Sequence, residues 1–418
     1  MRIVLFLSLS TSALAADWPA WRGAGSNGVS TDTAVALNWS RTENVKWKVD
    51  LPEPGNSTPI VWKDSILITQ PKQATGERLV ICLDRETGKR KWSASVPYST
   101  AEPTHATNPY ASSSAATDGQ RVIAWFGSAG LFAFDFQTGK QIWKRDLGIQ
   151  KHTWGYASTP VIHKDRAFLN FGPGERSFLL AFDVRTGKTL WQVDTPQGKG
   201  DKFNQWSPED MFGSWSTPLI VTSGGREELI VTHPRKVLSY DPATGKTLWS
   251  ADGLGDLVYP SPVLASTRQG QRVIIAASGF QGPSMVVSAD GSGKVLWRFD
   301  RSKPLIGSAV SKDGFLYWAD IQGVAQCIQL ATGEVLWAQR LPRAGEDNGV
   351  WSSPVLVGDR IYVMNKSSAT LVFRANPERF EELATNPLGE PSNSSVVIAG
   401  GDVFLRTHHA LWCIRRAP

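Results

Sequence analysis

Residues 241–249 read DPATGKTLW. The same pattern of an Asp, a Thr-Gly-Lys turn and a closing Trp recurs along the chain, in 84–92 (DRETGKRKW), 135–143 (DFQTGKQIW) and 183–191 (DVRTGKTLW), and in shorter form in 290–297 and 330–337. A phrase repeated at intervals of a few tens of residues indicates a repeat architecture, in which each copy is one supersecondary unit. The chain is therefore expected to form one closed array of equivalent units.

Each copy has the composition of a β-hairpin. An alternating apolar run such as FLLAFD at 178–183 precedes the Asp and has the period of a strand. The Asp caps the turn, the Gly supplies a positive φ, and the Lys begins a strand that ends at the Trp. A second signature, Ser-x-Pro or a close variant, marks an inner strand upstream of each hairpin and begins at residues 57, 112, 158, 216, 261, 307, 352 and 394.

Four antiparallel strands in each of eight units predict an all-β fold, a single eight-bladed β-propeller. The last unit, from Ser394, ends before a fourth strand, and the segment NVKWKVDLP from Asn44 is expected to complete this blade and close the ring. The predicted organisation is a signal peptide at 1–15, a lead-in segment at 16–43 and the propeller at 44–418.

The closing aromatic residues are expected to be structural, because blades diverge toward the rim and a large flat side chain fills the widening gap. In the seventh unit the phrase is replaced by RANPERFEEL, and Phe380 is expected to take the place of the Trp. The predicted blade-docking residues are Trp47, Trp92, Trp143, Trp191, Trp249, Trp297 and Trp337.

The start of the chain indicates export. An apolar run after Arg2 and the small-residue pattern Ala13-Leu14-Ala15 are typical of a secretory signal, with no Cys at the cut to suggest a lipoprotein. No later apolar run is long enough to span a bilayer, so no transmembrane segment is expected. The net charge of +6 is spread along the chain without a basic cluster, which argues against nucleic-acid binding. We expect a periplasmic or secreted protein.

Three cysteines occupy the same position of the repeat: Cys82, Cys327 and Cys413. Equivalent positions in neighbouring blades lie on the order of 10 Å apart, beyond the reach of a disulfide. We therefore expect three buried core thiols.

Strand order places the loops between blades, and those between second and third strands, on one face. Function on a rigid scaffold usually lies in such variable loops. The candidate ligand-binding residues on this face are His105, Asn108, His152, Trp154, Glu175, Arg176, Trp206, Glu209, Asp210, Glu346, Asp347 and Asn348.

Several of these candidates have two interpretations. His105 and His152 could face one another as a base or metal ligands, or be hydrogen-bonded spectators. Glu209 and Asp210 could hold Ca²⁺ together with residues 346–348, or be simply solvated, since no EF-hand or zinc spacing occurs. We therefore predict no metal site and no catalytic residue. Aromatic residues before the inner strands share one repeated position and are expected to form a packing ring: Tyr110, Tyr156, Trp215, Tyr259 and Trp351.

The phrase A-x-D-x-x-T-G-K-x-x-W, repeated with Ser-x-Pro inner strands, resembles the pyrroloquinoline-quinone (PQQ)-type propeller repeat. The chain is more similar to exported bacterial PQQ-like repeat proteins, which open as here with DWPAWRGAGSNGVS at 17–30. The superfamily contains quinoprotein alcohol dehydrogenases and the propeller subunit of the outer-membrane protein assembly machinery, which binds a partner without a cofactor.

The resemblance implies two functions. In the dehydrogenases the quinone stacks between a Trp and a disulfide of adjacent cysteines, and this sequence has no adjacent cysteines. We therefore expect a non-catalytic exported protein without a cofactor, whose loop face binds an envelope protein, peptide or glycan. The alternative is a PQQ- and calcium-dependent alcohol dehydrogenase. No feature of the sequence indicates an oligomeric state.

Overall fold

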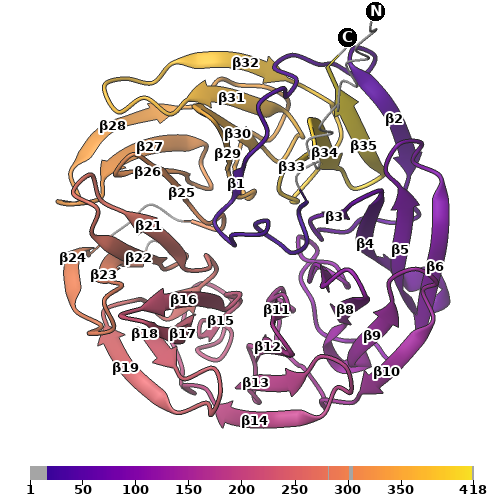
Figure 1. Ribbon diagram of the computed structural model, residues 1–418, viewed down its shortest axis with the longest axis horizontal. Coiled ribbons are helices and arrows are strands. Elements are labelled where there is room, and N and C mark those ends of the chain that lie inside the picture. The colour runs from indigo at the N-terminus through magenta and orange to yellow at the C-terminus, as the bar shows by residue number, and fades with distance from the viewer. Residues whose placement is uncertain (1–16, 281, 301–304, 417–418) are drawn as a thin grey trace, which may run out of the picture.

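Eight blades of four antiparallel strands surround a central axis in the computed structural model (Figure 1). The structure describes residues 17–280, 282–300 and 305–416, so the predicted signal peptide lies outside the described residues. The predicted all-β, eight-bladed propeller is confirmed. In blades 1 to 7 the four strands follow one another in chain order from the axis to the rim, whereas the outermost strand of blade 8 comes from the start of the chain.

The first four blades lie between residues 60 and 252. Blade 1 consists of β3 (Ile60–Trp62), β4 (Ser65–Lys72), β5 (Glu77–Asp84) and β6 (Arg90–Pro97). Blade 2 consists of β7 (Ala116–Thr117), β8 (Arg121–Trp125), β9 (Leu131–Asp135) and β10 (Gln141–Arg145). Blade 3 consists of β11 (Val161–His163), β12 (Arg166–Phe171), β13 (Phe178–Asp183) and β14 (Thr189–Asp194). Blade 4 consists of β16 (Leu219–Ser223), β17 (Arg226–His233), β18 (Lys236–Tyr240) and β19 (Thr247–Asp252).

The remaining blades complete the ring. Blade 5 consists of β21 (Val263–Ser266), β22 (Arg272–Ala277), β23 (Ser284–Ser288) and β24 (Val295–Phe299). Blade 6 consists of β25 (Val310–Lys312), β26 (Phe315–Ala319), β27 (Val324–Gln329) and β28 (Val335–Arg340). Blade 7 consists of β29 (Val355–Val357), β30 (Arg360–Met364), β31 (Thr370–Arg374) and β32 (Glu382–Asn386). Blade 8 consists of β33 (Val397–Ala399), β34 (Asp402–Arg406), β35 (Ala410–Arg415) and β2 (Val45–Asp50).

Short elements lie outside this four-strand pattern. β1 (Val29–Ser30) pairs in parallel with β29. Two connections between blades contain short strands that pair in parallel, β15 (Gly213–Ser214) and β20 (Leu257–Val258). Two single turns are 3-10 helices, η1 (Gln73–Thr75) and η2 (Gly127–Ala129).

The two ends of the propeller close the ring within blade 8. β2 pairs antiparallel with β35 and places Trp47 opposite Cys413, and Figure 1 shows the indigo and yellow strands side by side. The expected completion of the last blade by the segment from Asn44 is therefore confirmed. β2 thereby covers the edge of β35, which would otherwise be the outer edge of blade 8.

The turn phrase has the predicted chemistry. In blade 2, Asp135 Oδ1 accepts hydrogen bonds from the backbone N–H and the hydroxyl of Thr138, at 2.8 and 2.7 Å. Gly139 follows with φ of +69°, a conformation that a residue without a Cβ adopts freely.

The closing tryptophans dock each blade onto the next. The indole Nε1 of Trp143 donates to the main-chain oxygen of Val184, and its ring lies over Gly187 in the turn of blade 3. The same bond, 2.7–3.1 Å long, is made to the next blade by Trp47, Trp92, Trp191, Trp297 and Trp337. Each of these indoles thus lies at the junction between two blades, the position in which a structural role was predicted.

Blade 7 differs from the prediction. The position opposite Val372 is held by Ala384, whereas Phe380 precedes β32 and packs against Trp337 of blade 6, with ring centroids 5.7 Å apart. The lead-in segment supplies the missing aromatic. The Trp39 ring stacks on Tyr362. Its backbone N–H donates to Asn386 Oδ1 at 2.8 Å, which holds this part of the lead-in segment against blade 7.

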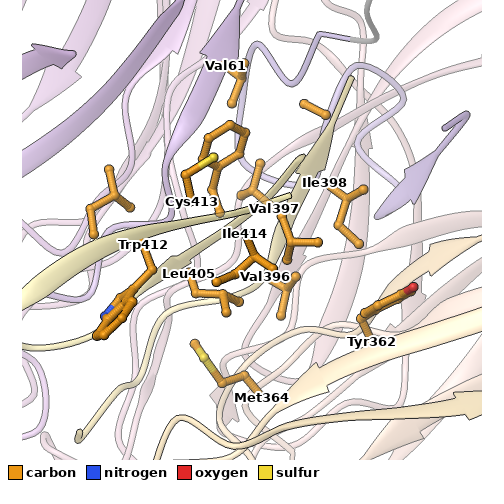
Figure 2. Packing of buried hydrophobic residues seen from close by; sticks show 14 of the residues in the cluster. Val61, Tyr362, Met364, Val396, Val397, Ile398, Leu405, Trp412, Cys413 and Ile414 are labelled. Atoms are coloured by element: carbon orange, nitrogen blue, oxygen red, sulfur yellow. The ribbon is translucent and has the colours of Figure 1, made fainter. Parts of the chain in front are cut away.

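The lead-in segment is therefore part of the core. Trp39 belongs to a buried cluster that joins blade 7 to blade 8, and Figure 2 shows Tyr362 and Met364 of blade 7 beside Val397 and Leu405 of blade 8. The cysteines are unpaired and buried, as expected. Burial raises the pKa of the Cys82 and Cys327 thiols to about 11.

Candidate functional site

A central cavity of about 420 Å³ opens at the loop face. Its walls come from the starts of the inner strands and from the connections between blades. The volume lies within the range of small-molecule sites, ~300–1,000 Å³.

Ser and Thr hydroxyls surround the axis at the level of this cavity. Each comes from the Ser-x-Pro signature that starts an inner strand. In seven interblade contacts the backbone N–H of one such residue donates to the hydroxyl of another in the adjoining blade, at 2.8–3.4 Å. We call this set the hydroxyl ring: Thr58, Ser114, Thr159, Thr217, Ser261, Ser308, Ser353 and Ser395. All residues of the hydroxyl ring except Ser308 line the cavity. The residues of the Ser-x-Pro signature that identifies the repeat therefore also form part of the cavity wall.

Aromatic side chains form most of the remaining wall. Trp215 and Tyr259 contact each other, with centroids 5.0 Å apart, and Trp351 comes from the connection before blade 7. These three residues were predicted to form part of a packing ring, and they line the cavity in the structure. Their repeated position before each inner strand was the available signal, because the inner strands start at the cavity.

Three predicted loop residues also line the cavity: His105, Asn108 and Trp154. The Trp154 ring lies 5.1 Å from His105 and 4.4 Å from Trp206, which adds a further aromatic layer. Phe280 reaches the same group from blade 5 and is 40% exposed. The mouth of the cavity is therefore aromatic.

The lead-in segment crosses the central opening of the ring (Figure 1). Trp18 and Val61 exchange two backbone hydrogen bonds of 2.8 Å, and β1 extends blade 7 inward. Between these anchors the Arg22 guanidinium donates to the main-chain oxygens of Pro354, at 2.7 Å, and Ala309. Burial lowers the pKa of Arg22 to about 9. The adjacent Trp21 lines the cavity, so the chain's own N-terminal segment contributes to its wall.

A second cavity of about 230 Å³ lies beside the first, between blades 3 and 4. It is lined by four other predicted residues: His152, Glu175, Glu209 and Asp210. His152 Nδ1 accepts the backbone N–H of Trp154 at 3.2 Å, its ring packs edge-on against Trp215, and burial lowers its pKa to about 4. His105 and His152 thus line different cavities and do not form a pair across the axis.

Most of the remaining predicted residues contact residues of their own or a neighbouring loop. Arg176 donates to the main-chain oxygen of Leu147 at 2.7 Å, and Glu346 is exposed. Asp347 pairs with Lys366, and the Asn348 Oδ1 accepts the backbone N–H of Ala344 at 2.6 Å.

The carboxylates do not gather around one point. Glu209 pairs with Lys199 at 2.6 Å, and Asp210 accepts a hydrogen bond from the Ser207 hydroxyl at 2.8 Å. Within 17–280, 282–300 and 305–416, no group of three or more His, Cys, Asp or Glu side chains could hold a metal ion.

The central cavity does not match a calcium-bound quinone. PQQ is a tricarboxylate, and buried carboxylates require cationic or metal partners. The described residues that line the cavity include no Lys, Arg, Asp or Glu. Arg301 and Lys303 lie outside the described residues. The described lining residues thus supply neither counter-charges for the quinone nor carboxylate ligands for Ca²⁺. A separate finding concerns membrane spans: among the described residues, no helix has the length and apolar character needed to span a bilayer.

Comparison with known proteins finds a family model and a curated protein that both carry the same description. The family model described as outer membrane protein assembly factor BamB matches residues 23–192 and 175–418. The protein of that name from Shewanella oneidensis is 23% identical over 254 residues, which cover 60% of this chain and only 58% of the relative's length.

Two solved structures share the fold. BamB of Moraxella catarrhalis has a TM-score of 0.63 at 14% identity and covers 88% of this chain and 99% of its own. The quinohemoprotein alcohol dehydrogenase of Comamonas testosteroni has a TM-score of 0.70 at 13% identity, over 96% of this chain and 81% of its own. At such identities these likenesses show the fold alone. Since the family model spans most of the chain, this protein belongs to the BamB family of PQQ-like repeat propellers.

Proposed function

We propose that the protein is an exported, non-catalytic propeller that binds a partner of the cell envelope at its loop face. The observation that carries this proposal is the central cavity, which combines an aromatic mouth with a neutral polar wall. Sites of this kind suit recognition, because aromatic anchors supply contact area and a few polar groups fix orientation. Membership of the BamB family supports a binding role.

The export step rests on the sequence pattern of residues 1–15 and on the relationship to BamB. Both are consistent with a place in the envelope. We propose a periplasmic or secreted location.

The dehydrogenase alternative is less well supported. Hydride transfer to a quinone requires a base and a bound cofactor, and the described lining offers one imidazole, that of His105, and no carboxylate. We propose that the cavity works without PQQ.

Site-specific photo-crosslinking tests the proposal. A photoreactive amino acid at position 280, at the cavity mouth, is expected to form adducts in the envelope of cells that produce the protein. The matched control is position 244, an exposed Thr in a turn on the opposite face. Equal labelling at both positions, or none at 280, would contradict a loop-face binding role.

Titration with PQQ and Ca²⁺ tests the alternative. Four tryptophans line the cavity, so a bound quinone would quench fluorescence strongly. We expect no saturable quenching. Saturable, calcium-dependent quenching with oxidation of an alcohol would instead make the protein a quinoprotein dehydrogenase.

A further inference from the structure

We propose that the central cavity binds a neutral saccharide, either free or as the end of a glycan chain. The inference rests on the proposed function and names the ligand class that the loop-face cavity takes. It is carried by three properties of the cavity wall: flat aromatic surfaces, neutral hydrogen-bonding groups and the absence of charge among its described residues.

The aromatic surfaces are held in place before any ligand binds. The Trp215 indole donates to the main-chain oxygen of Gly155 at 2.9 Å, which fixes its plane. Trp21 is next to Arg22, whose guanidinium donates to main-chain oxygens just before the inner strands of blades 6 and 7. A pyranose has apolar C–H faces, and rigid indole rings offer surfaces of matching size at low entropic cost.

Neutral polar groups surround these rings. The amide nitrogens of Asn56 and Asn393 both donate to the main-chain oxygen of Thr107, at 2.8 and 3.1 Å, which orients the two amides. The Oδ1 of Asn56 has no hydrogen-bond partner in the described structure. In the contacts above, seven of the eight hydroxyls of the ring each accept a backbone N–H, and a hydroxyl that accepts still has its own proton to donate. The wall therefore presents acceptors and donors, as the hydroxyl edge of a sugar requires.

The absence of charge selects against other ligands. A phosphate, a carboxylate or an ammonium group would lose its hydration in this cavity without gaining an opposite charge from a described lining residue. Nucleotides, acidic sugars and charged peptide segments are therefore disfavoured. A neutral saccharide loses only hydroxyl hydration, which the amides and hydroxyls replace.

An extended peptide is disfavoured for a second reason. Peptides that add to a propeller or sheet use free backbone N–H and C=O groups at a strand edge. In the hydroxyl ring, seven backbone N–H groups at the starts of the inner strands already donate to neighbouring hydroxyls. The wall at this level is thus made of side chains, and side-chain recognition of a compact ring fits it better than strand addition.

Isothermal titration of the mature protein tests the inference. The probes are glucose, galactose, N-acetylglucosamine and their β-linked disaccharides, with glucuronic acid as the charged counterpart. At least one neutral saccharide is expected to bind saturably, and more tightly than glucuronic acid. Tighter binding of the disaccharides than of the monosaccharides assigns the cavity to a glycan end; equal binding assigns it to a free sugar.

Variants locate the binding. Trp21→Ala is expected to weaken it about tenfold, the scale of one lost ring-stacking contact and its apolar area. Trp21→Phe keeps a stacking ring and should recover most of the affinity, which separates lost stacking from misfolding. Trp297→Phe changes a tryptophan between blades and should bind as the wild type does.

Absence of saturable binding by every neutral saccharide at low millimolar concentration would overturn the inference. So would wild-type affinity in Trp21→Ala, or equally tight binding of glucuronic acid. If position 280 still crosslinks to a protein while no saccharide binds, the proposed function stands and the cavity belongs to a peptide segment. If neither occurs, both proposals fail.

Discussion

The indole of Trp249 donates to the buried carboxylate of Glu228, with Nε1 and Oε2 2.7 Å apart. The six other docking tryptophans donate to a main-chain oxygen of the next blade, as Trp191 does to Pro242. The exception coincides with the shortened turn phrase of blade 5, DGSGK at 290–294, onto which Trp249 docks. Glu228, in the same blade as Trp249, thus supplies the acceptor.

Replacing Glu228 should destabilise the ring at blade 4. Its carboxylate accepts from Trp249, from the Ser239 hydroxyl at 2.8 Å and from Arg226 at 2.7 Å. Glu228→Leu leaves these donors without their acceptor and is expected to cost about 3 kcal/mol in the free energy of unfolding. Glu228→Gln retains one acceptor and should cost less. Urea unfolding measures both, with exposed Glu334→Gln as the control; an unchanged midpoint in Glu228→Leu would refute the role of the carboxylate.

The stability cost of replacing a turn glycine by alanine should depend on which atoms lie near the added Cβ. Gly187 has φ of +71°, and a Cβ there would lie 2.8 Å from ring atoms of Trp143. Gly225 has a similar φ of +81° with nothing within 4 Å. Gly225→Ala measures backbone strain alone, about 1 kcal/mol, whereas Gly187→Ala adds the clash with the docking ring and should cost about 3 kcal/mol in total. Equal losses in urea unfolding would mean that the Trp143 ring shifts freely.

The lead-in segment should be required for full stability. Trp39 is 3% exposed and belongs to the same buried cluster as Ala384, which joins blades 7 and 8. Trp39→Ala is expected to lower the free energy of unfolding by about 3–5 kcal/mol. Leu190→Ala, on an outer strand and 46% exposed, is the control and should change little. Similar unfolding curves for wild type and Trp39→Ala would show that the ring closes without this aromatic.

Most of the fold could be predicted from the sequence because its information is repeated. The Asp-to-Trp phrase encodes a turn and a docking contact at once, and the copies reinforce each other. The prediction for blade 7 was wrong because the turn phrase is not repeated there. The aromatic that completes it, Trp39, lies more than three hundred residues before Ala384, and no local pattern links the two positions.

The candidate site was predicted only in part. Loop position identified His105, Asn108 and Trp154, since variable connections converge on the axis. Trp21 was missed because it precedes the first repeat, and its place at the cavity depends on the pairing of Trp18 with Val61. The acidic loop residues do not gather at one point, since Glu209 and Asp347 each pair with a nearby lysine, Lys199 and Lys366.

Two buried histidines predict how stability depends on pH. Burial lowers the pKa of His233 to about 3, with a smaller effect of Lys236, and that of His152 to about 4, against a smaller opposing effect of Asp210. The unfolded chain takes up these protons near pH 6.5 and the folded protein does not. The contribution to stability is therefore complete above pH 6.5 and is lost as the pH falls toward 4 and 3.

Urea unfolding at pH 7 and pH 5 measures this loss. From the two lowered pKa values, each histidine is expected to remove about 2 kcal/mol of stability between these pH values. His152→Gln cannot take up a proton, so its stability should fall by about 2 kcal/mol less than that of the wild type between these pH values. Exposed His409→Gln is the control and should keep the wild-type dependence. The carboxylates of the turn phrases titrate at lower pH, because hydrogen bonds from Thr138 and its neighbours lower the pKa of Asp135 and its counterparts. A wild-type loss that persists in His152→Gln would therefore assign the acid sensitivity to groups other than this buried imidazole.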